Sequence, residues 1–383
     1  MKSLTAAVST NATAPVKSHY VVLDGLRGVA SIFVLLFHLF EPWSDGDATR
    51  QIINHGYLAV DFFFLLSGFV VAYAYDDRWS RMTQWDFYKR RLIRLQPMVV
   101  MGSLIGAALF YFQKGPAFPL IATTPPWKLF LFMLIGCTLI PVPPSMDIRG
   151  WAEMHPLNGP AWSLFYEYCA NILYAVGLRK LSNRALGIFV ALGAALLVQV
   201  AVFGTRGDLI GGWAIDPKEL HVGFARLLFP FFAGILLMRL GKRIHINNGF
   251  AVSSLLLIVS LCLPRFGGKE HFWMNGLYEG LCIILLFPFI VAIGAGEKRA
   301  EGTSIRIARF FGDLSFPLYI THYPLIYIYT GWIARDKPTP AQGAIWATAL
   351  FATAMTSAYA SLKFYDEPTR RWLSRKFLTK ATA

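Results

Sequence analysis

Hydrophobic runs separated by short basic segments are the main pattern of this sequence. A run of about 20 apolar residues has the length of a helix that crosses a lipid bilayer. Such runs predict membrane-spanning helices over residues 23–42, 57–75, 97–113, 161–178, 185–204, 223–240, 249–263, 276–294, 316–333 and 343–363. The pattern therefore predicts an all-α, polytopic membrane protein, built as a bundle of about ten transmembrane helices.

An eleventh apolar run, 129–141, is short for a spanning helix, and the distribution of lysine and arginine indicates its role. These residues gather before residue 23 and in the segments 76–96, 179–184, 239–247, 297–309 and 363–383. Since cytoplasmic loops carry the excess of Lys and Arg, these segments and both termini are expected on the cytoplasmic side. That arrangement requires an odd number of crossings between 96 and 161. The run 129–141 is therefore expected to be a re-entrant or interfacial helix.

The composition supports a membrane protein and argues against nucleic-acid binding. Of the 383 residues, 55% are hydrophobic and 15% are charged, whereas soluble domains carry about 25% charged residues. The net charge is +14, but the basic residues lie between apolar runs and not in a stripe with interleaved aromatic residues. The basic character is therefore attributed to membrane topology and membrane lipids, and no nucleic-acid partner is expected.

The chain is expected to form one membrane domain between two polar ends. Residues 1–20 are rich in Ser, Thr and Ala and lack an apolar core, which predicts a disordered cytoplasmic tail and not a signal peptide. Residues 21–371 hold all the predicted spans, and residues 372–383 are expected to form a basic cytoplasmic tail. The four cysteines are scattered through apolar segments and are expected to be packing residues.

Two ionisable residues, Arg27 and His38, lie in the first apolar run, LDGLRGVASIFVLLFHLF. The helix between them rises about 16 Å, so His38 lies past the midplane if Arg27 lies near one face of the bilayer. Ionisable residues are costly in the hydrocarbon core, and they usually face a protein interior and serve a function. A cation at the entrance and a titratable base deep inside indicate a membrane-embedded group-transfer enzyme.

The same run resembles the opening of the acyltransferase-3 family of integral membrane O-acyltransferases, whose first helix carries an Arg-(ten residues)-His motif. Further blocks resemble the family's motifs in the expected order: 56–73 with Asp61, Ser67 and Gly68; 87–97 with Arg91, Arg94 and Pro97; 158–167 with Asn158, Trp162, Ser163 and Glu167; 312–325; and 364–371. Departures are small, with Ala59 in place of a common glycine and Gln96 in place of a common aromatic residue. The chain ends shortly after its last predicted span and is expected to lack the soluble esterase-like domain that some members add.

The resemblance implies a membrane-embedded O-acyltransferase. The acyl group, most often acetyl, would pass from cytoplasmic acyl-coenzyme A to a hydroxyl of a cell-surface or lipid-linked saccharide at the bacterial inner membrane. No bound cofactor is implied, because acyl-coenzyme A is the donor substrate. His38 would be the general base, since histidine titrates near neutral pH. The alternative is a core histidine that is hydrogen-bonded to a neighbouring helix.

Two carboxylates join His38 as candidate catalytic residues. Asp61 would orient His38 or bind the acceptor hydroxyl, because a buried carboxylate needs a partner; its alternative role is a helix cap. Glu167 would line the reaction cavity, or form a purely structural ion pair with Arg27 or Arg226. Arg226 has no role of its own at this point.

Arg27, Arg91 and Arg94 are the candidate residues for binding the phosphates of acyl-coenzyme A. Arg91 and Arg94 lie three residues apart, so they share a helix face, and the guanidinium fork suits phosphate oxygens. The alternative is a basic loop held by anionic lipid headgroups. His322 would contact coenzyme A or act as a second acid or base, with Tyr319 on the same face; its alternative is a packing role.

The other motif positions have less defined roles. Asn158 would supply an amide to the acyl carbonyl or only shape a turn. Ser67, Trp162 and Ser163 belong to motifs without an assigned step, and Glu279 lies in a predicted span without a motif. The remaining histidines fall in loops without metal-ligand spacing on one helix, so no metal site is expected.

Two other functions fit many of the same features. A proton-coupled secondary transporter also carries ionisable residues within its spans, but no inverted repeat is visible, and a transporter would not release free thiol from acyl-coenzyme A. An acyltransferase for a small molecule or a macrolide-type glycoside fits every motif, because the motifs concern the donor and the chemistry. A structural scaffold would not need Arg27 and His38 within the membrane.

Overall fold

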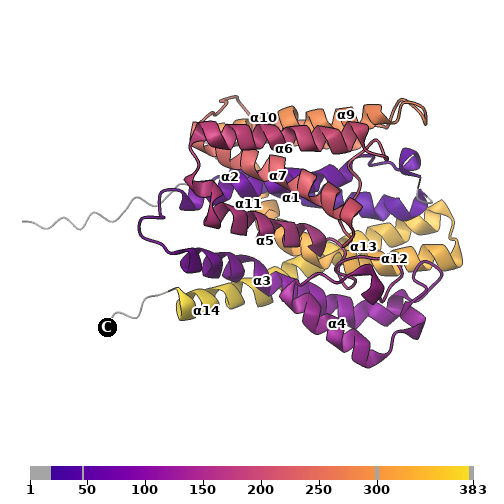
Figure 1. The fold of residues 1–383 in the computed structure, drawn as a ribbon. Coiled ribbons are helices and arrows are strands. Elements are labelled where there is room, and N and C mark those ends of the chain that lie inside the picture. Colours follow the sequence, from indigo (N-terminus) through magenta and orange to yellow (C-terminus); the bar gives the residue numbers. More distant parts are fainter. Residues whose placement is uncertain (1–18, 45–46, 298–301, 379–383) are drawn as a thin grey trace, which may run out of the picture.

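The computed structural model describes residues 19–44, 47–297 and 302–378, and the regular elements in these ranges are helices (Figure 1). Most of the predicted tail 1–20 therefore lies outside the described residues. The α-helices are α1 Val21–Phe40, α2 Ala59–Tyr75, α3 Gln84–Leu109, α4 Pro126–Thr138, α5 Ala161–Val176, α6 Asn183–Phe203, α7 Pro217–Leu240, α8 Gly249–Cys262, α9 Trp273–Leu281, α10 Phe287–Gly296, α11 Thr303–Thr321, α12 Tyr323–Asp336, α13 Pro340–Ala360 and α14 Glu367–Phe377. Single π-helical turns join α9 to α10 (Cys282–Leu286) and α13 to α14 (Ser361–Asp366).

The helices have the length and composition of a polytopic membrane protein. Seven helical segments in the described part are long and apolar enough to cross a membrane: Val21–Trp43, Gly56–Tyr75, Gln84–Gln113, Asn183–Phe203, Pro217–Leu240, Trp273–Gly296 and Pro340–Phe377. The apolar helices α4 and α8 are shorter, with 13 and 14 residues. Every predicted apolar run coincides with helix, so the predicted all-α, polytopic class is confirmed.

The span predicted at 316–333 has the wrong bounds. Two helices, α11 and α12, follow one another in this region and are separated only by His322. Pro317 lies inside α11, and Pro324 lies in the first turn of α12. Proline has no N–H to donate and its ring crowds the preceding turn, which explains the interruption. His322 therefore lies at a break between two helices and not two turns inside one span.

Two basic segments that lie outside the predicted spans are largely helical. The N-terminus of α3 is fixed by a capping box, in which Thr83 and Asp86 each satisfy a backbone N–H of the other. Arg91 and Arg94 therefore lie on one helix, α3, as their spacing predicts, and not in a basic loop. At the other end of the chain α14 extends to Phe377, so the domain boundary predicted at residue 371 falls within a helix.

Close packing of two helix pairs forms the centre of the bundle. The most extensive contacts are those of α1 with α11 and of α2 with α7. At the second pair a Cβ on Gly68 would overlap the carbonyl oxygen of Phe231, and a Cβ on Gly234 would overlap that of Leu65. Small residues allow helices to approach closely within a membrane. The glycine of the second-helix motif therefore serves the contact between α2 and α7.

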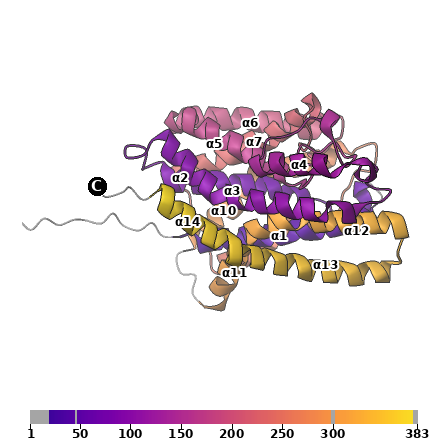
Figure 2. The ribbon, with the colours of Figure 1, turned by 90° about the horizontal axis from the view of Figure 1, so that it is seen from below.

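The bundle has two distinct ends. In both views α1 begins and α14 ends at the same end, on the left in Figures 1 and 2. Helix α1 runs away from this end, so that Arg27 is the nearer of its two ionisable motif residues and His38 the farther. The loop between α4 and α5 and the connection between α12 and α13 lie at the opposite end.

Candidate active site

Two cavities lie back to back inside the bundle. The first, which we call the cation-rich cavity, has a volume of about 440 Å³ and is lined mainly by α1, α2, α3, α5, α11 and α14. The second, which we call the His38 cavity, has a volume of about 510 Å³ and is lined by the C-terminal end of α1, by α2 and α7, and by loops before α5 and α7. Val60 and Tyr319 line both cavities.

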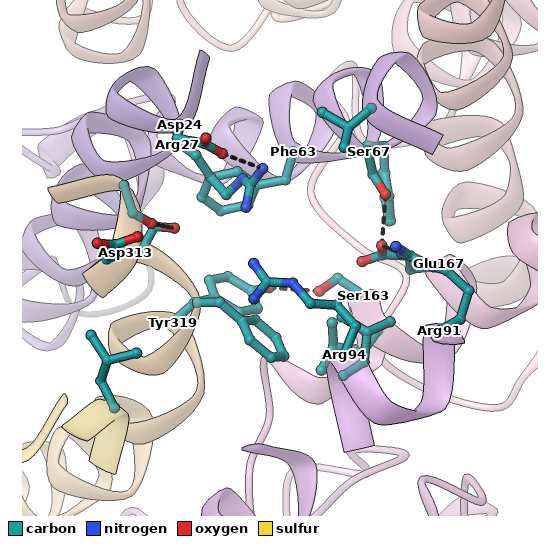
Figure 3. Close-up of a pocket in the computed structure, with 18 of the residues that line it drawn as sticks. Asp24, Arg27, Phe63, Ser67, Arg91, Arg94, Ser163, Glu167, Asp313 and Tyr319 are labelled. Carbon is teal, nitrogen blue, oxygen red and sulfur yellow. Dashed lines mark hydrogen bonds and ion pairs between the residues drawn. The ribbon is translucent and has the colours of Figure 1, made fainter. Parts of the chain in front are cut away.

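Four arginines, Arg27, Arg91, Arg94 and Arg370, line the cation-rich cavity. Figure 3 shows the first three of them. Asp24 accepts a hydrogen bond from Arg27 at 3.0 Å, and Asp366 lies 2.7 Å from the guanidinium of Arg370. Arg94 extends toward the middle of the cavity and makes no hydrogen bond to a residue that the structure describes. A guanidinium that keeps its donors available inside a cavity is suited to an anionic ligand, and phosphate oxygens match its geometry.

Glu167 fixes the fourth arginine, Arg91. Its Oε1 accepts hydrogen bonds from Arg91 at 2.6 Å and from the Ser67 hydroxyl at 2.6 Å. The alternative ion-pair partners predicted for Glu167, Arg27 and Arg226, are therefore wrong. Glu167 pairs with Arg91 of α3, and both of these side chains face the cation-rich cavity. Glu167 thus lies with the candidate donor-binding residues and not beside His38.

His38 is oriented by Glu41 in the other cavity. The Nδ1 atom of His38 lies 2.8 Å from Oε2 of Glu41, the first residue of the 3₁₀ turn Glu41–Trp43 that follows α1. The spacing of three residues brings the two side chains to one face. A proton on Nδ1 that is donated to the carboxylate leaves Nε2 as the basic nitrogen, which is the arrangement that a general base requires.

His322 contacts His38 and not the cation-rich cavity. Its ring stacks on that of His38, with the centroids 5.6 Å apart and an angle of 27° between the planes. It is fully buried, and its Nδ1 donates to the carbonyl oxygen of Leu318 at 3.0 Å. The predicted contact with acyl-coenzyme A is therefore not supported, because His322 lines neither large cavity. Tyr319, its predicted neighbour, does line the cation-rich cavity.

Asp61 does not orient His38, contrary to one predicted role. It is fully buried and forms an ion pair with Arg226, with Nη2 2.7 Å from Oδ2. Arg226 also donates to the carbonyl oxygens of Tyr57 and Gly211. Because Asp61 lies on α2 and Arg226 on α7, the ion pair links these two helices. Loss of either partner would leave an uncompensated buried charge. The orienting role predicted for Asp61 falls to Glu41.

The residues of the motif at 158–167 do not all face the same cavity. Asn158 donates its amide to the carbonyl oxygen of Ile320 at 2.9 Å and lines neither large cavity, which favours its structural alternative. Trp162 lines the His38 cavity, whereas Ser163 lines the cation-rich cavity and lies 2.7 Å from the Tyr319 hydroxyl. The beginning of α5 therefore separates the two cavities.

Several residues of the site have no counterpart among the predicted ones. Glu41 could have been found from its helical spacing to His38. Glu153 and Trp151 reach the His38 cavity from the long loop before α5, and Trp213 reaches it from the loop before α7. Their positions depend on how these loops fold back over the helices, which the spacing of residues does not reveal. Within the described ranges no group of three His, Cys, Asp or Glu side chains is arranged to hold a metal ion.

Glu153 carries a shifted pKa in the loop over the His38 cavity. Burial raises the pKa of its carboxyl to about 7, although Arg149 nearby and a hydrogen bond from Tyr327 at 2.5 Å both oppose the shift. The ordinary value for this side chain is 4.5. Between these two pH values the folded chain therefore holds a proton that the unfolded chain has released.

This shift predicts a pH-dependent stability change for Glu153→Gln. Raising the pH from 5 to 8 lowers the free energy of unfolding of the parent, because the buried carboxyl of Glu153 loses its proton less readily than the same carboxyl in the unfolded chain. Glutamine does not titrate, so the variant lacks this loss of stability. We expect the stability of the variant relative to the parent to increase by about 1–3 kcal/mol between pH 5 and pH 8, which raises its relative unfolding midpoint. Thermal unfolding in detergent at both pH values measures it. An identical difference at pH 5 and pH 8 would contradict the burial of an ionisable carboxyl.

Comparisons with known proteins show which proteins the chain is similar to. The family model described as "Acyltransferase domain" matches residues 20–362. "Protein 2 in picA locus" of Rhizobium radiobacter is 32% identical over 192 residues, which are 48% of this chain and 96% of that protein. O-acetyltransferase OatA of Staphylococcus aureus (strain NCTC 8325 / PS 47) is 24% identical over 369 residues, covering 91% of this chain and 57% of OatA. Peptidoglycan O-acetyltransferase OatA of Listeria monocytogenes is 23% identical over 377 residues, covering 91% and 55%.

The extent of these matches identifies the family. The chain spans little more than half the length of the OatA proteins that it matches. No solved structure matches the chain. The family model, in contrast, covers nearly all of the described helices. It includes all residues that line the two cavities except His19, Glu367 and Arg370. This chain, with its polytopic helical bundle, belongs to the acyltransferase-3 family of membrane O-acyltransferases.

Proposed function

We propose that the protein transfers an acetyl group from cytoplasmic acyl-coenzyme A to a hydroxyl of a cell-surface or lipid-linked saccharide. The observation that carries the proposal is the placement of arginines and His38 in two cavities that share a wall. One cavity suits an anionic donor, and the other offers a base to an acceptor hydroxyl. Relatives named O-acetyltransferases support acetyl as the transferred group.

The cation-rich cavity is the proposed donor site. Acyl-coenzyme A carries three phosphate groups, and Arg27, Arg91, Arg94 and Arg370 face this cavity. Arg27 and Arg91 are held in place by carboxylates, so the cost of ordering them is met before the donor binds. Arg94 offers its donors directly. The thioester end would point from these arginines toward Tyr319 and the second cavity.

His38 is the proposed general base. Its Nε2 takes the proton of the acceptor hydroxyl, and the hydroxyl oxygen attacks the carbonyl carbon of the thioester. The carbon–sulfur bond then breaks, the ester bond is complete, and the proton passes from His38 to the departing thiolate of coenzyme A. Glu41, 2.8 Å from Nδ1, stabilises the imidazolium that forms between these steps. The enclosed site limits the access of water to the thioester.

The His38 cavity is the proposed acceptor site. Trp151, Trp162 and Trp213 line it together with Glu153 and Glu41. Flat aromatic rings with a few polar groups among them are suited to a sugar, whose ring has apolar C–H faces and hydroxyl edges. The Listeria relative is named for peptidoglycan, which supports a cell-surface saccharide. A small-molecule glycoside would bind by the same contacts and is the second candidate acceptor.

The proposed setting is the bacterial inner membrane with both termini in the cytoplasm. The basic segments 76–96 and 363–378 lie at the end of the bundle where α1 begins and α14 ends, and the positive-inside rule assigns that end to the cytoplasm. The cation-rich cavity, which Arg370 of α14 helps to line, is then accessible to cytoplasmic acyl-coenzyme A. The loop that carries Glu153 lies on the side of the saccharide.

Transfer of labelled acetyl tests the proposal. Membranes that contain the parent, His38→Ala or no copy of the protein are incubated with acetyl-labelled acetyl-coenzyme A, and label is counted in glycan and lipid fractions. We expect label only with the parent, together with release of free coenzyme A, and the labelled fraction then gives the acceptor class. Parent membranes with intact glycans and no label above the empty control would refute acetyl transfer. Proton-coupled uptake without thiol release would instead support the transporter.

A further inference from the structure

We infer that Val60 and Tyr319 form the wall through which the acyl group reaches the acceptor, and that the size of the side chain at position 60 limits the length of the acyl chain. The inference rests on the proposed function, because it needs a donor in the cation-rich cavity and an acceptor in the His38 cavity. According to the inference, Val60 determines the specificity for the acyl donor, although its side chain has no catalytic group.

The two cavities meet at these two side chains. Among the described residues Val60 and Tyr319 alone line both cavities. They come from different helices, since Val60 lies in the first turn of α2 and Tyr319 in the last turns of α11. Both are buried, with exposed fractions of 6% and 5%. A group that moves from one cavity to the other at this point must pass between them.

Tyr319 is held rigidly in the wall. Its hydroxyl lies 2.7 Å from the Ser163 hydroxyl and donates to the carbonyl oxygen of Pro160 at 3.1 Å. Ser163 lines the cation-rich cavity and Pro160 lines the His38 cavity, so the hydroxyl is anchored between the two. Its ring also packs nearly perpendicular to that of Phe63, with the centroids 5.5 Å apart. Tyr319 cannot turn aside without breaking these contacts.

Val60 is the part of the wall whose size can vary. Its side chain forms no hydrogen bond, and its two methyl groups only occupy space. The thioester carbonyl must come close to a hydroxyl that His38 can deprotonate, so the acyl chain has to be accommodated near this wall. A short acyl chain fits beside a valine, whereas each added methylene needs volume that the valine occupies. Hydrophobic pockets discriminate by about 10–200-fold for one methylene.

Substitutions at position 60 test the inference by acyl-chain length. Steady-state kinetics with acetyl-, butyryl- and hexanoyl-coenzyme A are compared for the parent, Val60→Ala and Val60→Phe. We expect Val60→Ala to raise the ratio of kcat/KM for hexanoyl over acetyl at least about tenfold, and Val60→Phe to lower acetyl kcat by about tenfold or more. The Kd of coenzyme A should change less than about twofold in both, because the arginines are untouched.

Val71→Ala is the matched control. Val71 lies on the same helix and is equally buried, but it lines neither cavity, so its chain-length ratio should equal that of the parent. Thermal unfolding in detergent shows whether Val60→Ala is folded. If it is not, Val60→Ile, which adds a methyl group, replaces it and should lower the ratio of kcat/KM for butyryl- over acetyl-coenzyme A. A parent that transfers acyl groups, with unchanged ratios in the variants at position 60, overturns the inference alone. A parent that transfers none overturns the proposed function and the inference with it.

Discussion

Replacement of His38 by alanine is expected to lower kcat for acyl transfer by about 10²–10⁴-fold, the usual contribution of a positioned general base. The expected size follows from the geometry, because Glu41 orients the imidazole and the ring of His322 covers one of its faces. The binding of coenzyme A should be preserved, since His38 lies in the other cavity. Stopped assays of acyl transfer and equilibrium binding of coenzyme A measure the two effects separately.

Two further variants make this result specific. Glu41→Gln keeps a hydrogen-bonding group beside Nδ1 but removes the charge, so it should lower kcat with little change in donor binding. His221→Ala is the matched control, because His221 is exposed, pairs only with Gln199 in the described structure and lines neither cavity. Normal kcat in His38→Ala, in protein that is folded and inserted, would refute the assignment of the base.

Replacement of Arg94 by alanine is expected to raise the KM for acyl-coenzyme A by about 10–100-fold, which corresponds to a charge-assisted hydrogen bond of about 1.5–3 kcal/mol. Arg94 is the best single target, because its removal leaves no hydrogen-bond partner unsatisfied among the described residues. Arg91→Ala, by contrast, leaves the carboxylate of Glu167 without its arginine. The double variant Arg91→Ala, Arg94→Ala should raise this KM further and leave acceptor affinity unchanged.

Arg90→Ala provides the matched control for charge. Arg90 lies on the same helix and contributes the same charge near the membrane, but it does not line the cation-rich cavity. Its KM for acyl-coenzyme A should equal that of the parent. A larger KM for the acceptor in Arg94→Ala, with an unchanged KM for the donor, would contradict the assignment of this cavity to the donor.

The fold could largely be predicted from the sequence because a bilayer imposes helix lengths on apolar runs. The same rule fails where a helix is interrupted inside an apolar region. Around His322 the apolar pattern continues without change, but Pro317 and Pro324 divide it into α11 and α12. Amphipathic extensions are also missed: α3 starts well before its apolar part, because the capping box at Thr83 starts the helix in a basic segment.

The candidate site could be predicted in part. The spacing of Arg91 and Arg94 on one helix was enough to place them together, and Arg27 joins them in the same cavity. Partners across helices were not accessible in this way. Asp61 and Arg226 are 165 residues apart in the chain, and nothing in their local sequence indicates that they form a pair. Whether a carboxylate faces a cavity or another helix depends on the packing of helices that are distant in sequence.

The glycine contacts between α2 and α7 have a mechanical consequence for the wall between the cavities. Because Gly68 and Gly234 bring the two backbones into contact, α2 has no clearance to slide or rotate against α7, and Val60 moves only with the pair. The opposite side of the wall belongs to α11, which is interrupted just after Tyr319 by a break between two prolines. Because Tyr319 is nevertheless held by its hydrogen bonds to Ser163 and Pro160, both sides of the passage are fixed, and its width depends on the sizes of the side chains at positions 60 and 319.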